Sequence, residues 1–264
     1  LVRALRAGNF DRAVLLHHSH TLAFATLAAG IRVRQGYGFG AQRWLLNRGP
    51  YLPDPARRMH QLQRATAFLR AAEVPLADPE PRMLVTRAAR DAVAGRLAGV
   101  RRPLVAMGIG SSEAHRQWGA ERMAALGGAL LKAGWGSLAL IGGPDDGALV
   151  TAIQAGLGDN AGRTVPALGW HLAETAALIA AAEFYVGNDT GMMNLAAATG
   201  VRSYGLFGAS PPLGHSRQIV AVTPPDRQQS PTGMRRISPD AVLAVIQADR
   251  GGLAPRPDQV QSQP

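Results

Sequence analysis

The second part of the chain alternates short apolar segments with helical ones, and this pattern constrains the fold more than any other feature. Apolar runs with the length of buried strands occupy residues 104–109, 137–141, 164–168, 184–187 and 201–207. Segments of helical character separate them at residues 120–133, 148–155, 172–182 and 192–199. Strands that alternate with helices predict a parallel sheet with right-handed crossovers and helices on both faces. The sequence therefore predicts an α/β, doubly wound domain, whose ligands lie beyond the carboxyl ends of the strands.

A shorter α/β pattern precedes this domain. Strands are expected at residues 13–16 and 31–37, with helices at residues 21–29 and 60–72 and a long loop at residues 38–58. Pro75, Pro79 and Pro81 then mark a linker, because proline lacks an amide proton and restricts the residue before it. We expect an N-terminal domain at residues 1–82 and a C-terminal domain at residues 83–237, the latter opening with a bridging helix. A last helix is expected at residues 238–250, with Ser238 as its cap, and a disordered tail at residues 251–264.

Composition limits the function classes. Hydrophobic residues make up 47% of the 264 residues, which suffices for a sizeable core, and aromatic residues only 5%. The chain has no cysteine, so disulfides and thiolate metal sites are excluded. A net charge of +10 favours anionic partners, but the arginines are scattered, so we expect no nucleic acid. No signal peptide and no uninterrupted apolar stretch of about 18–20 residues are visible, so a cytoplasmic protein with at most peripheral membrane contact is expected.

The segment at residues 187–198 is the most informative for chemistry. A strand ends at Gly187 and a helix begins near Gly191. Amides at a helix start lack internal partners and carry partial positive charge, so they form a natural anion site. Gly191 lets a phosphate approach, Thr190 adds a hydroxyl, and Asp189 can accept from sugar hydroxyls. The same residues would also serve as an ordinary capped junction, and spacing alone does not separate the two interpretations.

Two further loops follow predicted strands. In the first, Ser111 and Ser112 offer hydroxyls and amides, and Arg116 offers a guanidinium suited to phosphate. This loop lacks the Gly-Lys-Ser/Thr ending of a phosphate-binding P-loop and the third glycine of a dinucleotide fingerprint. In the second loop, at residues 142–147, Asp145 or Asp146 could bind ribose hydroxyls or merely cap a helix.

Histidines gather at the end of the first predicted strand. His18 and His20 share one side of an extended segment and could converge. Their spacing implies no third ligand, so we expect no metal and favour a polar loop for an anionic substrate.

These loops, in this order, resemble those of the heptosyltransferase family, glycosyltransferase family nine. The resemblance is carried by the segments at residues 108–118, by Gly142-Gly143-Pro144, by Asn188-Asp189-Thr190-Gly191 with Ala196-Ala197-Ala198, and by Phe207-Gly208 with Ser210 and Pro212. Leu5-Arg6, Phe10-Asp11 and Ala29-Gly30-Ile31-Arg32 are similar to the family's acceptor-side domain. The similarity covers nearly all of residues 1–250.

The resemblance implies a GT-B fold, in which two Rossmann-like domains face a cleft and the last helix crosses back. It implies inverting, metal-independent transfer of a heptose-like sugar from an ADP-activated donor, with no cofactor, to an anionic lipopolysaccharide-type acceptor near the inner membrane. Donor phosphates would be held by Ser111, Ser112, Arg116, Thr190, Gly191 and Met192. Asp146, Trp170, Asp189 and Asn194 would bind the nucleoside or donor sugar. His18 and His20 would lie on the acceptor side.

The sequence departs from the family pattern at three points. Arg116 replaces a lysine, and Asn194 replaces a histidine. About two βα units that precede this region in the family are not present, so the resemblance implies an incomplete N-terminal domain and leaves the catalytic base unassigned. Asp11, Asp54 and the group at residues 17–20 are the nearby candidates. A catalytically inactive nucleotide-sugar-binding or assembly protein is the alternative, and the incomplete glycine pattern disfavours a nicotinamide-dependent oxidoreductase.

Overall fold

The computed structural model describes residues 1–78 and 80–255. The chain divides into two compact units, Leu1–Pro79 (unit 1) and Glu80–Pro264 (unit 2), and each is described by itself. The division falls within the predicted proline-rich linker, three residues before the boundary expected after residue 82.

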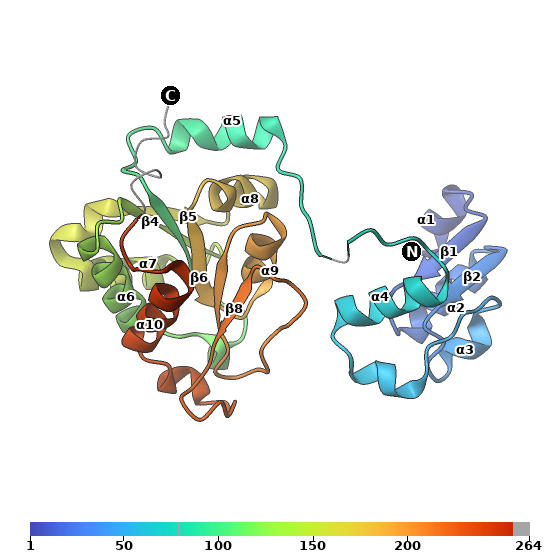
Figure 1. Ribbon diagram of the computed structural model, residues 1–264. Coiled ribbons are helices and arrows are strands. Elements are labelled where there is room, and N and C mark those ends of the chain that lie inside the picture. The colour runs from blue at the N-terminus through green and yellow to red at the C-terminus, as the bar shows by residue number, and fades with distance from the viewer. Residues whose placement is uncertain (79, 256–264) are drawn as a thin grey trace. The chain divides into compact units, whose positions relative to one another are not determined.

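Unit 2 is built on a six-stranded parallel sheet (Figure 1). Its strands are β3 (Leu104–Gly108), β4 (Ser137–Gly142), β5 (Thr164–Leu168), β6 (Phe184–Asn188), β7 (Ser203–Leu206) and β8 (Ile219–Val222). Their order is β5-β4-β3-β6-β7-β8, and every neighbouring pair is parallel. The strand order reverses between β3 and β6, which is where open α/β sheets place their ligands.

Helices cover both faces of this sheet, because successive side chains of a buried strand point to opposite faces. Val105 and Met107 belong to a core shared with α6 (Ala120–Lys132), α7 (Gly147–Leu157) and α10 (Pro239–Arg250). Leu104 and Ala106 belong to a second core shared with α5 (Arg87–Arg96), α8 (Leu172–Ala180) and α9 (Gly191–Ala198). Short 3-10 helices at Ala114–Arg116, Gly158–Arg163 and Gly233–Arg236 complete the unit.

Two features of unit 2 differ from the sequence expectation. Strand β8 is not among the five strands expected from the sequence; a glycine- and proline-rich segment precedes its four residues. Residues 251–255 were counted with a disordered tail, yet the Trp135 indole donates to the carbonyl of Leu253 at 2.7 Å, and Leu253 packs on the core. The rest of that expected tail, residues 256–264, lies outside the described residues. Ser238 caps α10 as predicted, by accepting from the amide of Ala241.

Unit 1 contains a small sheet. Strands β1 (Arg12–Leu15) and β2 (Val33–Gly36) pair in parallel, with Arg12 opposite Val33. Helices α1 (Val2–Ala7), α2 (His20–Ala28), α3 (Gln42–Leu45) and α4 (Gln61–Ala71), with a 3-10 helix at Asp54–Arg58, make up the rest. The segment at residues 38–58, expected as one loop, thus contains two short helices.

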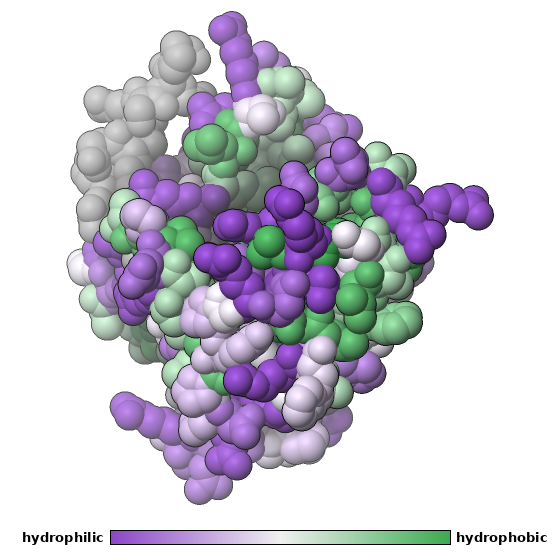
Figure 2. Space-filling view, turned by 90° about the vertical axis from the view of Figure 1, so that its right-hand side faces the viewer, coloured by the Kyte–Doolittle hydropathy of each residue, from purple (hydrophilic) through white to green (hydrophobic). Residues whose placement is uncertain are grey.

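The apolar core of unit 1 is small. Its cluster consists of Tyr37, Phe39, Ala56 and Phe68. Several large apolar side chains of the same unit are exposed: Leu1, Phe10, Val14, Leu16, Phe24 and Leu27. Figure 2 shows one face of the molecule, on which apolar side chains lie among hydrophilic ones.

Candidate functional site

A cavity of about 510 Å³ opens at the carboxyl ends of the strands of unit 2. It is lined by the ends of β3 and β4, by the loops that follow β3, β4, β5 and β6, and by the first residues of α8 and α9: Gly108, Gly110, Ser111, Ser112, Ile141, Gly142, Gly143, Pro144, Asp145, Asp146, Gly169, Trp170, Leu172, Thr175, Thr190, Gly191 and Met192. The cavity therefore spans the point where the strand order reverses. Seven of the residues predicted from the sequence line it: Ser111, Ser112, Asp146, Trp170, Thr190, Gly191 and Met192.

The start of α9 forms one wall of this cavity. Thr190 is the N-cap, and its hydroxyl accepts from the amide of Met192 at 3.3 Å. A Cβ added to Gly191 would meet no atom within 4 Å, so the space beside the first helical amide is open. Open amides with a positive partial charge favour a phosphate or carboxylate at this wall.

The carboxylate of Asp146 occupies the opposite wall. It accepts from the amide of Gly143 at 2.7 Å. A Cβ on Gly110 would lie 2.0 Å from this carboxylate, and a Cβ on Gly142 would lie 2.7 Å from it. These two glycines therefore make the room in which Asp146 reaches the cavity, where a half-buried carboxylate can accept from ribose hydroxyls.

The loop after β3 is fixed by a residue that the sequence analysis did not assign. Asn188, fully buried at the end of β6, donates to the carbonyls of Ile109 at 2.9 Å and Gly110 at 3.2 Å. Its carbonyl oxygen accepts from the amide of Trp118 at 3.1 Å. Asn188 thus holds both ends of the loop that carries Ser111 and Ser112. An amide side chain directly after a buried strand is the signal that could have indicated this role.

Trp170 lies in the loop after β5 and is half-buried. The Arg96 guanidinium stacks over its ring at 4.3 Å and pairs with Glu174 at 3.3 Å. The indole is thereby oriented by α5 and α8 while it still lines the cavity. A flat apolar surface of this kind suits a nucleobase.

Three predicted site residues do not line the cavity: Arg116, Asp189 and Asn194. Arg116 lies 3.1 Å from Glu113 and 3.4 Å from Asp189, so two carboxylates hold its guanidinium. Asp189 is 7% exposed and also accepts from the hydroxyl of Ser210, a contact that the sequence analysis did not predict. Arg116 and Asp189, both expected as ligand contacts, thus form an ion pair with each other in this structure.

Two buried polar groups near the start of α9 have no hydrogen-bond partner among the described residues. One is the side-chain oxygen of Asn194, in the first turn of the helix. The other is the hydroxyl of Tyr185 on β6, whose pKa is raised well above its usual value by burial. Unpaired buried polar groups are costly, so each requires a physical explanation.

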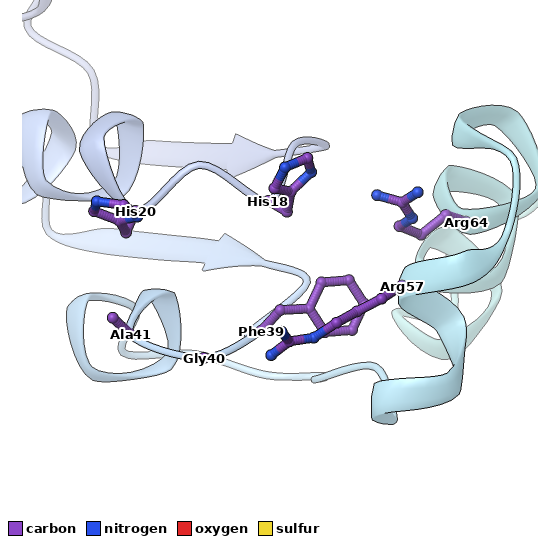
Figure 3. A pocket seen from close by; sticks show the side chains of 7 residues that line it. All are labelled: His18, His20, Phe39, Gly40, Ala41, Arg57 and Arg64. Carbon is purple, nitrogen blue, oxygen red and sulfur yellow. The ribbon is translucent and has the colours of Figure 1, made fainter.

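Unit 1 has a pocket of its own, with a volume of about 430 Å³ (Figure 3). Its lining residues are His18, His20, Phe39, Gly40, Ala41, Arg57 and Arg64. Figure 3 shows the Arg64 guanidinium pointing from α4 toward His18, while Arg57 extends along Phe39. His18 and His20 were predicted as acceptor-side residues, whereas Arg57 and Arg64 were not predicted as site residues.

The lining of this pocket is cationic. Arg64 is 8% exposed, donates to the carbonyl of Met59 at 2.7 Å and lies over the Tyr37 ring at 5.6 Å. Arg57 lies over the Phe39 ring at 5.1 Å and pairs with Asp54 at 3.0 Å. No carboxylate is among the lining residues. Two guanidiniums beside two imidazoles favour an anionic ligand.

Residues 1–78 and 80–255 contain no group of three or more His, Cys, Asp or Glu residues that could hold a metal ion. In the same ranges, no helix has the length and apolar character that are needed to span a bilayer.

The chain matches the model of glycosyltransferase family 9 (heptosyltransferase) over residues 1–231. The chain belongs to this family. It is therefore a glycosyltransferase, and the predicted family and α/β GT-B fold are confirmed. No curated protein matches the chain significantly.

Solved structures of family members share this fold. The ADP-heptose lps heptosyltransferase II of E. coli is similar, with a TM-score of 0.77 and 24% identity over 94% of this chain and 78% of that one. A glycosyltransferase family 9 protein from Veillonella parvula is similar with a TM-score of 0.77 and 17% identity, over 94% of this chain and 76% of that one. The E. coli heptosyltransferase WaaC with ADP-2-deoxy-2-fluoro heptose is similar with a TM-score of 0.71 and 19% identity, over 94% of this chain and 75% of that one.

Proposed function

We propose that this glycosyltransferase moves a heptose-like sugar from an ADP-activated donor to an anionic, lipopolysaccharide-type acceptor, with inversion and without a metal. The observation that carries the donor side is the open start of α9 in a cavity at the β3/β6 reversal, beside Asp146 and Trp170. Two similar structures are the ADP-heptose lps heptosyltransferase II of E. coli and the E. coli heptosyltransferase WaaC with ADP-2-deoxy-2-fluoro heptose, which supports ADP as the nucleotide. A cytoplasmic site of action at the inner membrane surface belongs to the same proposal.

The donor would bind with its diphosphate at the amides of Gly191 and Met192. Ser111 and Ser112 would contact the phosphates from the loop that Asn188 holds. Asp146 would accept from the ribose, and Trp170 would pack on the base. Fixed amides that face the diphosphate stabilise the negative charge that develops as the nucleotide leaves.

The transfer itself is a displacement at the anomeric carbon. An acceptor hydroxyl oxygen forms the new bond to that carbon as the bond to the diphosphate oxygen breaks, and ADP departs with the electron pair. The hydroxyl proton passes to a base, which remains unassigned. Of the sequence candidates, Asp54 is paired with Arg57 and Asp11 lies 3.9 Å from Arg32 on the surface.

The acceptor would be recognised through its negative groups by the cationic pocket of unit 1. We expect Arg57→Gln to raise KM for a phosphorylated acceptor while the affinity for ADP stays unchanged. Arg43→Gln is the matched control, because Arg43 also stacks over an aromatic ring of unit 1, that of Tyr51, and does not line the pocket. Equal effects of the two variants would contradict an acceptor role of the pocket.

A thermal-shift panel with ADP, UDP, GDP and NAD tests the donor side. We expect ADP alone to stabilise the protein, by about 2.7 kcal/mol at a concentration 100 times its Kd. Gly191→Val should remove this stabilisation without loss of fold, because its Cβ has free space in the cavity. Stabilisation by NAD alone, or ADP affinity unchanged by Gly191→Val, would sink the proposal.

A protein of the same fold that binds nucleotide sugar without transferring it is the second candidate. Asp54, one candidate for the catalytic base, is paired with Arg57, and this pairing favours the second candidate. Stabilisation by ADP combined with no release of ADP from a sugar donor, in the presence of acceptor, would select this candidate.

A further inference from the structure

The hydroxyl of Tyr185 is buried at the heart of unit 2 and has no hydrogen-bond partner among the described residues. Tyr185 lies on β6, next to the reversal of the strand order, and its side chain is 0% exposed. A buried hydroxyl without a partner destabilises the fold, whereas phenylalanine would fill the same space without that cost. Packing therefore does not account for the oxygen atom.

Two paired glycines make room for this oxygen. A Cβ on Gly108 would lie 1.7 Å from the Tyr185 hydroxyl, and a Cβ on Gly187 would lie 2.7 Å from it. These glycines are opposite each other at the carboxyl ends of β3 and β6. Gly108 also lines the donor cavity. The hydroxyl is thus directed along the sheet toward the cavity, into space that any larger residue at either position would occupy.

The polar groups that influence the hydroxyl belong to the α9 junction. Burial raises the pKa of Tyr185 most; the nearby Thr190 side chain acts to lower it, and the charge of Asp189 acts to raise it. The phenol consequently stays protonated at neutral pH and is available as a donor. Thr190 is the N-cap whose oxygen accepts the 3.3 Å bond from the amide of Met192.

An anion at the start of α9 would change these bonds. The anion would accept the hydrogen bond from the Met192 amide, and the Thr190 side-chain oxygen would then no longer accept from that amide. The Tyr185 hydroxyl is the adjacent donor that can replace that amide. A threonine hydroxyl that accepts from a tyrosine has its own proton free to donate to the anion.

We propose that Tyr185 is a positioning residue for the diphosphate of a nucleotide donor. Its hydroxyl donates to Thr190 Oγ1 and turns the Thr190 proton toward a phosphate oxygen at the start of α9. This inference rests on the proposed function, since it takes the α9 junction as the diphosphate site. It explains why an unpaired hydroxyl is present beneath two glycines: the oxygen has its partner in the complex.

Tyr185→Phe tests the proposal, with Tyr204→Phe as the matched control. Tyr204 is equally buried on the neighbouring strand β7, but its hydroxyl donates to Asp249 at 2.9 Å. Two quantities are measured on the full chain: the unfolding midpoint in urea without ligand, and the ADP affinity by calorimetry. For Tyr185→Phe we expect an equal or higher midpoint and an ADP affinity about tenfold lower, as for one lost hydrogen bond to a charged network. For Tyr204→Phe we expect a lower midpoint and unchanged ADP affinity.

A double-mutant cycle tests the route through Thr190. If Tyr185 acts through that hydroxyl, Thr190→Val combined with Tyr185→Phe should bind ADP no more weakly than Thr190→Val alone. Additive losses would overturn the Thr190 route. An ADP affinity unchanged by Tyr185→Phe, or a midpoint lowered as in Tyr204→Phe, would overturn the inference.

Pyrophosphate as a second probe separates this inference from the proposed function. Wild-type protein that binds pyrophosphate but not ADP would overturn the proposed donor, and the Tyr185 comparison would then be made with pyrophosphate. Wild-type protein that binds neither would overturn both. Normal ADP binding by wild-type protein and Tyr185→Phe alike would overturn the inference alone.

Discussion

Strands β3 and β1 each open a parallel pair, yet their surroundings differ. Every residue of β3 is buried, because helices cover both faces of the sheet in unit 2. In β1 exposed and half-buried residues alternate, and Val14 keeps 47% of its surface exposed. The two pockets differ in the same way: glycines and the start of a helix line the one in unit 2, whereas long cationic side chains line the one in unit 1. A similar local α/β pattern thus yields a rigid site only where a second layer completes the core.

Separating the units would have the largest effect. We expect residues 80–264 to unfold cooperatively and to bind ADP as the full chain does, because the lining of the donor cavity and both large cores lie in unit 2. Residues 1–79 should unfold without a cooperative transition, because the apolar cluster of unit 1 is small. Urea unfolding followed by circular dichroism checks both fragments. A sharp transition for residues 1–79 would show that the exposed apolar side chains do not limit its stability.

One phenylalanine in each unit differs in burial. Phe184 is 0% exposed and packs between the rings of Trp135 and Tyr204, at centroid distances of 5.0 and 5.4 Å. We expect Phe184→Ala to lower the free energy of unfolding by about 3–5 kcal/mol. Phe24, on α2 of unit 1, is 58% exposed, and Phe24→Ala should change this free energy by less than about 0.5 kcal/mol. Urea titrations measure both, and similar losses would mean that Phe24 is covered in solution.

Two asparagines extend the comparison to polar side chains. Asn188 makes three hydrogen bonds to the backbone of the β3 loop, two of them buried and one part-buried, so Asn188→Ala leaves groups of that loop unpaired. We expect a loss of about 2–3 kcal/mol of stability and weaker ADP binding, since the loop carries Ser111 and Ser112. Asn47 similarly bridges backbone groups, Arg34 N and Arg32 O, but is exposed. Asn47→Ala should cost about 0.5 kcal/mol, because water replaces its bonds.

Equal losses of stability in Asn188→Ala and Asn47→Ala would contradict the argument that a hydrogen bond costs more to lose when it is buried. Retained ADP affinity in Asn188→Ala would show that the loop after β3 contributes little to the donor site.

The sequence predicted the elements of unit 2 because their periodicity is local. The five predicted strands and the start of α9 follow from runs such as the one at residues 184–187, and a helix start after a strand dictates an anion-binding geometry. Strand β8 was missed because an edge strand of four residues after a proline-rich loop carries too weak a pattern.

Contacts between distant segments could not be predicted in the same way. The pairing of Arg116 with Asp189 joins loops that are 73 residues apart, so no local pattern reveals that the guanidinium is held by carboxylates. Arg64 reaches the unit 1 pocket from α4, where a helical arginine is expected to face solvent. Tyr185 has the signature of a core residue, and only the glycines opposite its hydroxyl distinguish it.

Two aspartates that face arginines give the smallest expected difference. Asp249 accepts from Arg202 Nε at 2.8 Å and from Tyr204 at 2.9 Å, and the bond from Arg202 is the main cause that holds its pKa below its usual value. The folded state therefore binds the Asp249 carboxyl proton less tightly than the unfolded state does. The contribution of the charged carboxylate to the free energy of unfolding is full above the unfolded pKa of about 3.9, and it is lost as the pH falls through the folded pKa. We expect Asp249→Asn to cost about 1 kcal/mol at pH 7, and the stability gap from the wild type to start narrowing below about pH 4. Asp11, 88% exposed and 3.9 Å from Arg32 in unit 1, is the control, and Asp11→Asn should change stability by less than about 0.5 kcal/mol at either pH. Urea unfolding at pH 7 and pH 3 measures both; a gap for Asp249→Asn that is as wide at pH 3 as at pH 7 would mean that the carboxylate charge does not stabilise unit 2.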